Sequence, residues 1–112
     1  MSKPSKRSLQ VSKMIQRKIA VMLQQYKHDP RLNEIIITDV QLSADLKIAK
    51  IYFTVFNKTH ANEVTKLLQQ ETKHIRHLLA HEMTLRYVPE LHFIYDQMTE
   101  QAEHLHQLID SL

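Results

Sequence analysis

Glycine and cysteine are both absent from this 112-residue chain, and each absence excludes a class of function. Glycine lets a backbone approach phosphate closely, so the chain has no Walker loop, no dinucleotide fingerprint and no G-x-x-G nucleic-acid clamp. Without cysteine there is no disulfide, thiolate metal site or cysteine nucleophile, which fits a reducing cytoplasm. Apolar runs long enough for a membrane span and the apolar core of a secretory signal are also missing. We therefore expect a single cytoplasmic domain.

Acidic residues are missing from the beginning of the chain, and basic residues from its end. The first carboxylate is Asp29, and before it stand Lys3, Lys6, Arg7, Lys13, Arg17, Lys18 and Lys27. After Arg86 there is no lysine or arginine, so the formal net charge of +3 hides a strong asymmetry. Cations concentrated on one side favour a polyanionic partner, because neutralised phosphates release counterions. The alternative interpretation is a solvated basic face that keeps the protein soluble.

Hydrophobic periodicity predicts an α+β domain with helices layered on a three-stranded sheet. Apolar residues at three- and four-residue spacing predict a helix over about residues 8–27, ended by Asp29 and Pro30. Alternating apolar residues predict strands over 34–42, 46–56 and 91–95. In the second strand, Ala49, Ile51, Phe53 and Val55 are predicted core residues, and Lys50 and Tyr52 belong to a less covered face.

Helical periodicity also covers residues 61–86, but a wholly polar stretch at 69–73 predicts a kink between two helices there. Thr99 is placed to cap a last, short helix that carries several carboxylates. The predicted organisation is a basic extension at 1–7, a core domain at 8–98 and the acidic terminal helix at 99–112.

This order of elements matches the type II K-homology scaffold, and four local segments carry a closer resemblance. They are Asp-Pro-Arg-Leu at 29–32, Asp-Leu-Lys-Ile-Ala-Lys-Ile-Tyr at 45–52, Ile75-Arg76, and the run 85–91 that leads into Tyr95-Asp96. Over roughly residues 8–96 the chain resembles the ribosome-binding factor A family of bacterial small-subunit assembly factors.

The resemblance implies a non-catalytic, K-homology-like protein with the order α-β-β-α-kink-α-β. It implies binding to the precursor of the small (30S) ribosomal subunit and assistance in late maturation of 16S rRNA, including its 5′ end region. It also implies a role in cold adaptation, a cytoplasmic location and other assembly factors, such as a maturation GTPase, as further partners. The family's interhelical kink typically reads alanine, any residue, glycine; here the matching positions are Glu71, Thr72 and Lys73.

Long cations on a helix face can follow a nucleic-acid backbone, and such contacts position a protein without reading sequence. The predicted RNA-binding residues are Lys6, Arg7, Lys13, Arg17, Lys18, Arg31, Lys50, Lys73 and Arg76. Some of these positions have a second interpretation. Arg31 is also placed to form a salt bridge that fixes the turn after Pro30. Tyr52, next to the predicted contacts, fits an ordinary cross-strand position better than a stacking platform.

His74, His77 and His81 occupy one helical face at spacings of three and four. No H-E-x-x-H pattern accompanies them, so we expect a polar surface that becomes cationic in mild acid, with no metal site and no cofactor. No nucleophile, base or carboxylate pair is implied by spacing, so we do not expect an enzyme.

Two rival functions remain open at this point. The first is a general single-stranded RNA-binding domain on the same scaffold, which would bind naked oligonucleotides as tightly as subunits. The second is a protein-interaction module that docks the terminal helix through Leu105, Leu108 and Leu112. In each case we expect a monomer.

Overall fold

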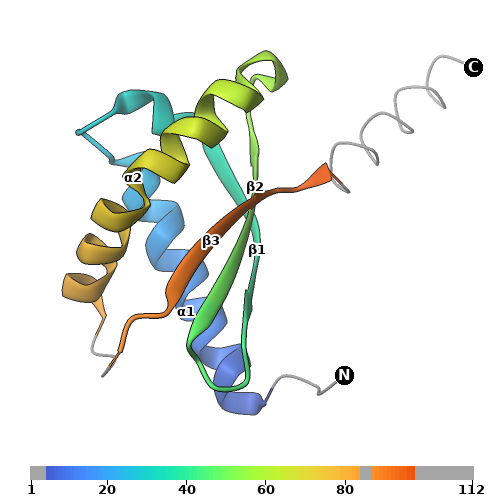
Figure 1. The fold of residues 1–112 in the computed structure, drawn as a ribbon, viewed down its shortest axis with the longest axis vertical. Coiled ribbons are helices and arrows are strands. Elements are labelled where there is room, and N and C mark those ends of the chain that lie inside the picture. Colours follow the sequence, from blue (N-terminus) through green and yellow to red (C-terminus); the bar gives the residue numbers. More distant parts are fainter. Residues whose placement is uncertain (1–4, 84–86, 98–112) are drawn as a thin grey trace, which may run out of the picture.

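The computed structural model of the chain describes residues 5–83 and 87–97, which form two long helices and three strands (Figure 1). In chain order they are α1 (Lys6–Gln24), β1 (Ile35–Leu42), β2 (Ile48–Val55), α2 (Ala61–Glu82) and β3 (Glu90–Tyr95). Short 3-10 helices, η1 (Pro30–Glu34) and η2 (Lys58–His60), precede β1 and α2. The predicted α+β class and the three predicted strands are confirmed. The predicted terminal helix at 99–112 and Arg86 lie outside the described residues.

Helix α1 starts and ends a little earlier than its apolar pattern predicts. Ser5 is the N-cap: its hydroxyl accepts the backbone N–H of Ser8 at 3.1 Å, and its carbonyl accepts the Ser8 hydroxyl at 2.9 Å. At the other end the side-chain amide of Asn33 donates to the carbonyl of Leu23 at 2.7 Å, which satisfies one of the groups that every helix end leaves unpaired. The chain therefore leaves the helix before it reaches Pro30.

The sheet has the order β1-β2-β3, with β1 antiparallel and β3 parallel to the central strand. Phe53 on β2 pairs with Ile37 on one side and Tyr95 on the other. The hairpin between β1 and β2 places Leu46 at a φ of 63°, a conformation that glycine usually supplies. Beside it, the Ser43 hydroxyl accepts the backbone N–H groups of Lys47 and Ile48. Side-chain bonding thus stabilises a turn in a chain that has no glycine.

Both helices cover the same face of the sheet (Figure 1). Completely buried residues of α1 and α2, among them Ile15 and Ile75, belong to one core with the alternate side chains of β2. The predicted core positions of that strand are confirmed: Ala49, Ile51, Phe53 and Val55 are all fully buried. Thr54, which alternates with these core residues, is buried too, and its hydroxyl accepts a hydrogen bond from the Lys58 ammonium at 2.8 Å.

The predicted division of residues 61–86 into two helices is wrong, because α2 is one continuous helix from Ala61 to Glu82. The polar stretch at 69–73 does not break it, because glutamine, glutamate and lysine favour the helix as much as most apolar residues do. Within this stretch the Thr72 hydroxyl donates to the Leu68 carbonyl at 2.7 Å. A hydroxyl bonded in this way tends to bend a helix without ending it. Within the described part of the chain, no helix is both long and apolar enough to cross a membrane.

Candidate nucleic-acid interface

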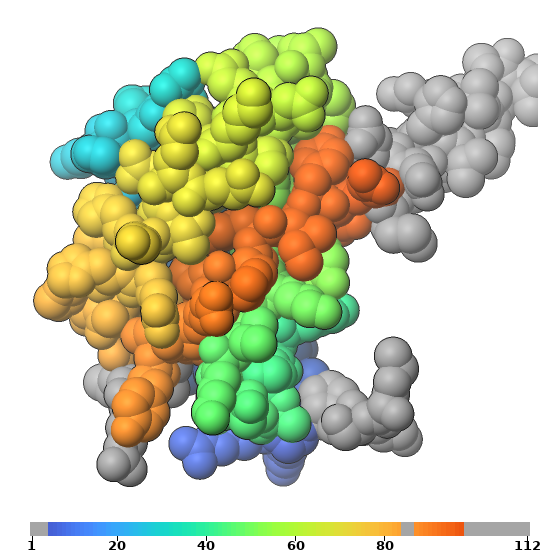
Figure 2. Space-filling model, viewed as in Figure 1, coloured from blue at the N-terminus to red at the C-terminus, as the bar shows by residue number. Residues whose placement is uncertain are grey.

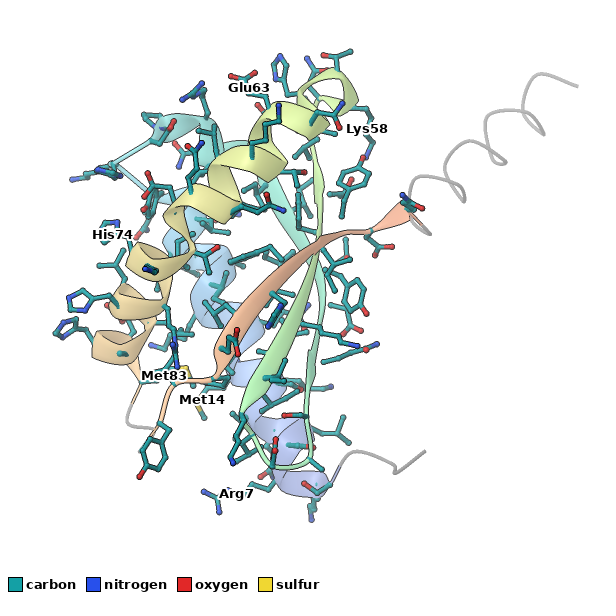
Figure 3. All side chains as sticks on the ribbon, in the orientation of Figure 1. Arg7, Met14, Lys58, Glu63, His74 and Met83 are labelled. Atoms are coloured by element: carbon teal, nitrogen blue, oxygen red, sulfur yellow. The ribbon has the colours of Figure 1, made fainter. Side chains whose placement is uncertain are left out.

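The exposed side of α1 carries five of the predicted RNA-binding residues, here called the α1 cationic face: Lys6, Arg7, Lys13, Arg17 and Lys18. All five are exposed, and Figure 3 shows Arg7 extending away from the fold near the start of the helix. Lys6, Lys13 and Arg17 follow one another at spacings of seven and four, so they form one stripe along the helix. The structure therefore brings these cations together on one element.

The α1 cationic face has few internal partners. Lys18 lies 3.8 Å from the Glu82 carboxylate of α2, and both side chains are about half exposed. Within residues 5–83 and 87–97, Lys6, Arg7, Lys13 and Arg17 form no ion pair. The first turn of α1 also has no acidic residue, although its unpaired N–H groups favour negative charge. An external anion would satisfy both the cations and the helix end.

Arg31 is already committed to the fold. Its Nη2 and Nε atoms donate to the two Asp29 carboxylate oxygens at 2.9 and 3.1 Å, and its Nη1 donates to Glu63 on α2 at 2.7 Å. The hydrogen bond from Arg31 lowers the pKa of Asp29, and these carboxylates raise the pKa of Arg31. This arrangement supports the structural interpretation of Arg31, since an RNA phosphate would have to compete with two carboxylates.

The two predicted RNA-binding residues on α2 differ in whether they have a partner inside the fold. Lys73 is exposed with no hydrogen bond or ion pair among the described residues. The Arg76 guanidinium donates to the Val88 carbonyl at 2.8 Å and so ties α2 to the segment that leads into β3. Arg76 therefore has a role in the fold whether or not it contacts RNA.

Lys50 lies on the face of the sheet that the helices leave uncovered, opposite Gln41 on β1 and His92 on β3. Its neighbour Tyr52 is half-buried and pairs with Asp39 and Ile94, which is the expected cross-strand position. Figure 2 shows β3 at the surface between α2 and the β1–β2 hairpin. The predicted RNA-binding residues thus lie on four elements, α1, η1, β2 and α2, and only those on α1 form a dense group.

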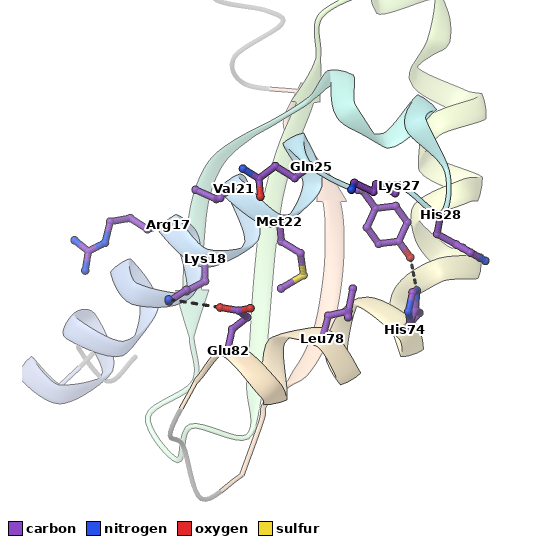
Figure 4. A pocket seen from close by; sticks show the side chains of 11 residues that line it. Arg17, Lys18, Val21, Met22, Gln25, Lys27, His28, His74, Leu78 and Glu82 are labelled. Carbon is purple, nitrogen blue, oxygen red and sulfur yellow. Dashed lines mark hydrogen bonds and ion pairs between the residues drawn. The ribbon is translucent and has the colours of Figure 1, made fainter.

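A groove of about 660 Å³ runs between α1 and α2 (Figure 4). Cations line one end, where Arg17 and Lys18 lie, and the apolar side chains of Val21, Met22 and Leu78 form its middle. The other end is lined by aromatic and imidazole rings. The groove therefore extends the α1 cationic face toward α2.

Sequence reasoning missed the group at that far end, here called the Tyr26 cluster: Tyr26, His28, Glu71 and His74. The Tyr26 hydroxyl lies 2.8 Å from a Glu71 carboxylate oxygen and 2.7 Å from Nδ1 of His74, the second contact being drawn in Figure 4. Nδ1 of His28 lies 3.0 Å from the other Glu71 oxygen. Burial and the Glu71 carboxylate raise the pKa of Tyr26, so its hydroxyl keeps its proton and donates. Because both Glu71 oxygens are hydrogen-bonded within the Tyr26 cluster, this carboxylate does not point toward an approaching RNA phosphate.

The three histidines of α2 are all exposed, as a polar surface requires, but they have different neighbours. His74 turns toward Tyr26 and His28, and its ring centroid lies 5.2 Å from that of His28. His77 and His81 form a separate exposed pair, with their Nε2 atoms 3.2 Å apart. The three positions keep their predicted spacing on α2, but only His74 has a partner on another segment of the chain among the described residues.

The family model of ribosome-binding factor A matches residues 7–109 of the chain. The relatives named ribosome-binding factor A include one from Legionella pneumophila (strain Paris), which is 44% identical over all of this chain and 91% of its own length. Another, from Coxiella burnetii, is 39% identical over 95% of this chain and 89% of its own.

Solved structures share the fold. The crystal structure of ribosome-binding factor A from Thermus thermophilus superposes with a TM-score of 0.68 at 23% identity, covering 79% of this chain and 94% of that one. A homology model of the Thermus thermophilus protein, fitted into a cryo-EM map of its complex with 30S, gives a TM-score of 0.64 at 24% identity over 74% and 88% of the two chains. An NMR structure of a Thermotoga maritima protein gives 0.68 at 26% identity over 84% and 91%.

Proposed function

Because the chain belongs to the ribosome-binding factor A family, we propose that it binds the small ribosomal subunit through the α1 cationic face. The observation that carries this proposal is a group of cations on one helix that have no ion pair inside the part of the fold that the structure describes. Arg31 and Arg76 are bonded within the fold, whereas Lys6, Arg7, Lys13 and Arg17 have no ion pair within the described residues. Cations that do not stabilise the fold remain available to neutralise phosphates and release counterions.

We assign the protein a role in late maturation of 16S rRNA, including its 5′ end region, and in growth in the cold. The action is non-catalytic and takes place in the cytoplasm. Binding energy is sufficient for this role, because a ligand that binds one RNA conformation more tightly shifts the population toward it. A maturation GTPase is a further partner under this proposal.

The complete chain is sedimented with purified small subunits at several salt concentrations, and the bound fraction gives the association constant. Each phosphate contact contributes about 0.7 to 0.9 to the slope of log K against log salt. The Lys13→Ala/Arg17→Ala variant should bind more weakly, and its slope should be smaller by about 1.5. A slope equal to that of the native protein would contradict the assignment of the interface to α1.

A matched control removes two exposed cations from other surfaces, Lys47 in the hairpin and Lys66 on α2. The Lys47→Ala/Lys66→Ala variant has the same net charge as the α1 variant, so we expect it to keep nearly the native slope. An equal loss in both variants would show that the total charge, and not the α1 cationic face, determines binding.

A labelled single-stranded RNA oligonucleotide, titrated under the same conditions, distinguishes the rival RNA-binding function. The proposal predicts tighter binding to the subunit than to the free strand. Equal affinity for both would indicate a general single-stranded RNA-binding domain. Binding to the subunit that is independent of salt would instead favour a protein contact.

A further inference from the structure

His28, Glu71 and His74 bring two imidazoles and one carboxylate together at one end of the groove between the helices. Nδ1 of His28 lies 3.0 Å from one Glu71 oxygen, and Nδ1 of His74 lies 3.8 Å from the other. One candidate ligand atom from each of the three residues falls within 4.8 Å of the other two. Figure 4 shows both histidines beside the groove, one from the segment after α1 and one from α2.

We propose that these three side chains bind one divalent transition-metal ion, with Zn²⁺ as the ion that their chemistry fits best. Imidazole nitrogen and carboxylate oxygen bind zinc at about 2.0–2.2 Å in a tetrahedron, which separates neighbouring ligands by about 3.3–3.6 Å. The two observed separations bracket this range, and the candidate atoms of the two histidines lie within 4.8 Å of each other. To bind the ion, Nδ1 of His74 would exchange its 2.7 Å contact with the Tyr26 hydroxyl for the metal. Three protein ligands leave the fourth position for water.

The surroundings of Glu71 resemble the support that metal ligands receive in proteins. Its side chain is 17% exposed, whereas those of His28 and His74 are 63% and 43% exposed, so the carboxylate is anchored and the imidazoles remain accessible. The Tyr26 hydroxyl donates to Glu71 at 2.8 Å, and a hydrogen bond to a ligating carboxylate fixes its orientation. Tyr26 thus holds the ligand in place from outside the coordination sphere.

The ion would connect two elements that are distant in the sequence. His28 belongs to the segment between α1 and η1, and it is 43 positions from Glu71 on α2. A bound ion would therefore fix the end of the groove between α1 and α2. Since binding is coupled to the folded arrangement, zinc should also raise the unfolding temperature.

The pair His77 and His81 provides an internal comparison. These residues also lie on α2 and are exposed, with their Nε2 atoms 3.2 Å apart, but no carboxylate is bonded to them among the described residues. They offer two ligands where the proposed site offers three, so the proposed site should bind zinc more tightly.

The test is a titration of the complete, tag-free chain with zinc chloride. Isothermal titration calorimetry, in a buffer that does not bind metal, measures the affinity and the number of ions bound. The native protein should bind one ion in its tightest phase. The His28→Ala/His74→Ala variant should lose at least tenfold in affinity, and the His77→Ala/His81→Ala variant should keep that phase unchanged. Retention of the tight phase in the first variant, its loss only in the second, or no binding by the native protein would each overturn the proposal.

Two further measurements separate loss of the site from loss of the fold. Circular dichroism without metal must show that each variant folds, and zinc at a hundredfold excess over its dissociation constant should raise the native melting temperature by about 5 °C or more.

The variant Glu71→Gln keeps the size of the side chain and a hydrogen-bonding partner for Tyr26, but removes the charge. It should fold and bind zinc more weakly; native affinity in this variant would contradict a ligand role for Glu71. None of these measurements involves RNA, so their outcome is independent of the proposed ribosomal function.

Discussion

Helices α1 and α2 bury the same kind of side chain but use their exposed sides differently. Ile15 of α1 and Ile75 of α2 are both completely buried in one core. On its exposed side α2 bonds to other parts of the chain: Glu63 to Arg31, Glu71 to Tyr26 and Arg76 to the Val88 carbonyl. The exposed side of α1 instead presents four cations with no ion pair among the described residues. Internal pairing therefore distinguishes charges that hold the fold from charges available to a partner.

The buried sides of α1 and α2 should contribute equally to the stability of the fold. Truncation of one buried isoleucine on each helix tests this and gives the largest expected loss of unfolding free energy. Both Ile15→Ala and Ile75→Ala remove a fully buried side chain from the shared core, and each should lower the free energy of unfolding by about 2–5 kcal/mol. Urea denaturation followed by circular dichroism measures both variants. A loss below about 1 kcal/mol in only one variant would show that the helices are not equally anchored.

The polar sides should differ. Glu71→Ala removes the charged acceptor of the Tyr26 hydroxyl, which then keeps only its contact with His74, and should cost about 1–3 kcal/mol of unfolding free energy. Arg17→Ala removes an exposed side chain with no ion pair among the described residues, and should change this free energy by less than about 0.5 kcal/mol. The same denaturation experiment compares them. Equal losses would contradict the division of roles between α1 and α2.

A smaller loss than that of Glu71→Ala is expected for Tyr26→Phe, and this loss depends on alkaline pH. Tyr26→Phe removes the hydrogen bond to Glu71 and should cost about 1 kcal/mol at pH 8. Because the pKa of Tyr26 is raised in the folded state, this contribution is complete below the unfolded value near 10 and is lost as pH rises above it. Denaturation of the native protein and the variant at pH 8, 10 and 11 gives the difference, which should shrink above pH 10. A difference that grows with pH would contradict the assigned direction of the pKa shift.

Local patterns were reliable wherever burial repeats along one element. The alternation of Ala49, Ile51, Phe53 and Val55 predicts the buried side of β2, and the apolar period that contains Ile15 and Ile19, four residues apart, predicts the inner side of α1. These predictions succeed because a strand or helix places residues of equal spacing on one face. The boundaries were less accurate, since the caps Ser5 and Asn33 act through individual hydrogen bonds.

Predictions that depended on partners were less successful. The sequence allows two roles for Arg31, an RNA contact and a salt bridge within the fold. Its hydrogen bonds to Asp29 and Glu63 favour the salt bridge. The spacing of His74, His77 and His81 gives no sign that His74 contacts Tyr26 and Glu71. The polar stretch at 69–73 predicts two helices, whereas α2 is continuous because polar residues such as glutamine, glutamate and lysine are good helix formers.

The sequence by itself determined the α+β class, the three strands, the core side of β2 and the concentration of cations before Asp29. Each of these follows from composition or from a period within one segment. Only the tertiary structure decided which cations keep a partner inside the fold, and that His28 meets Glu71 across 43 positions. Contacts between separate segments depend on how the helices and strands pack against one another. The periodicity of residues within one segment carries no information about that packing.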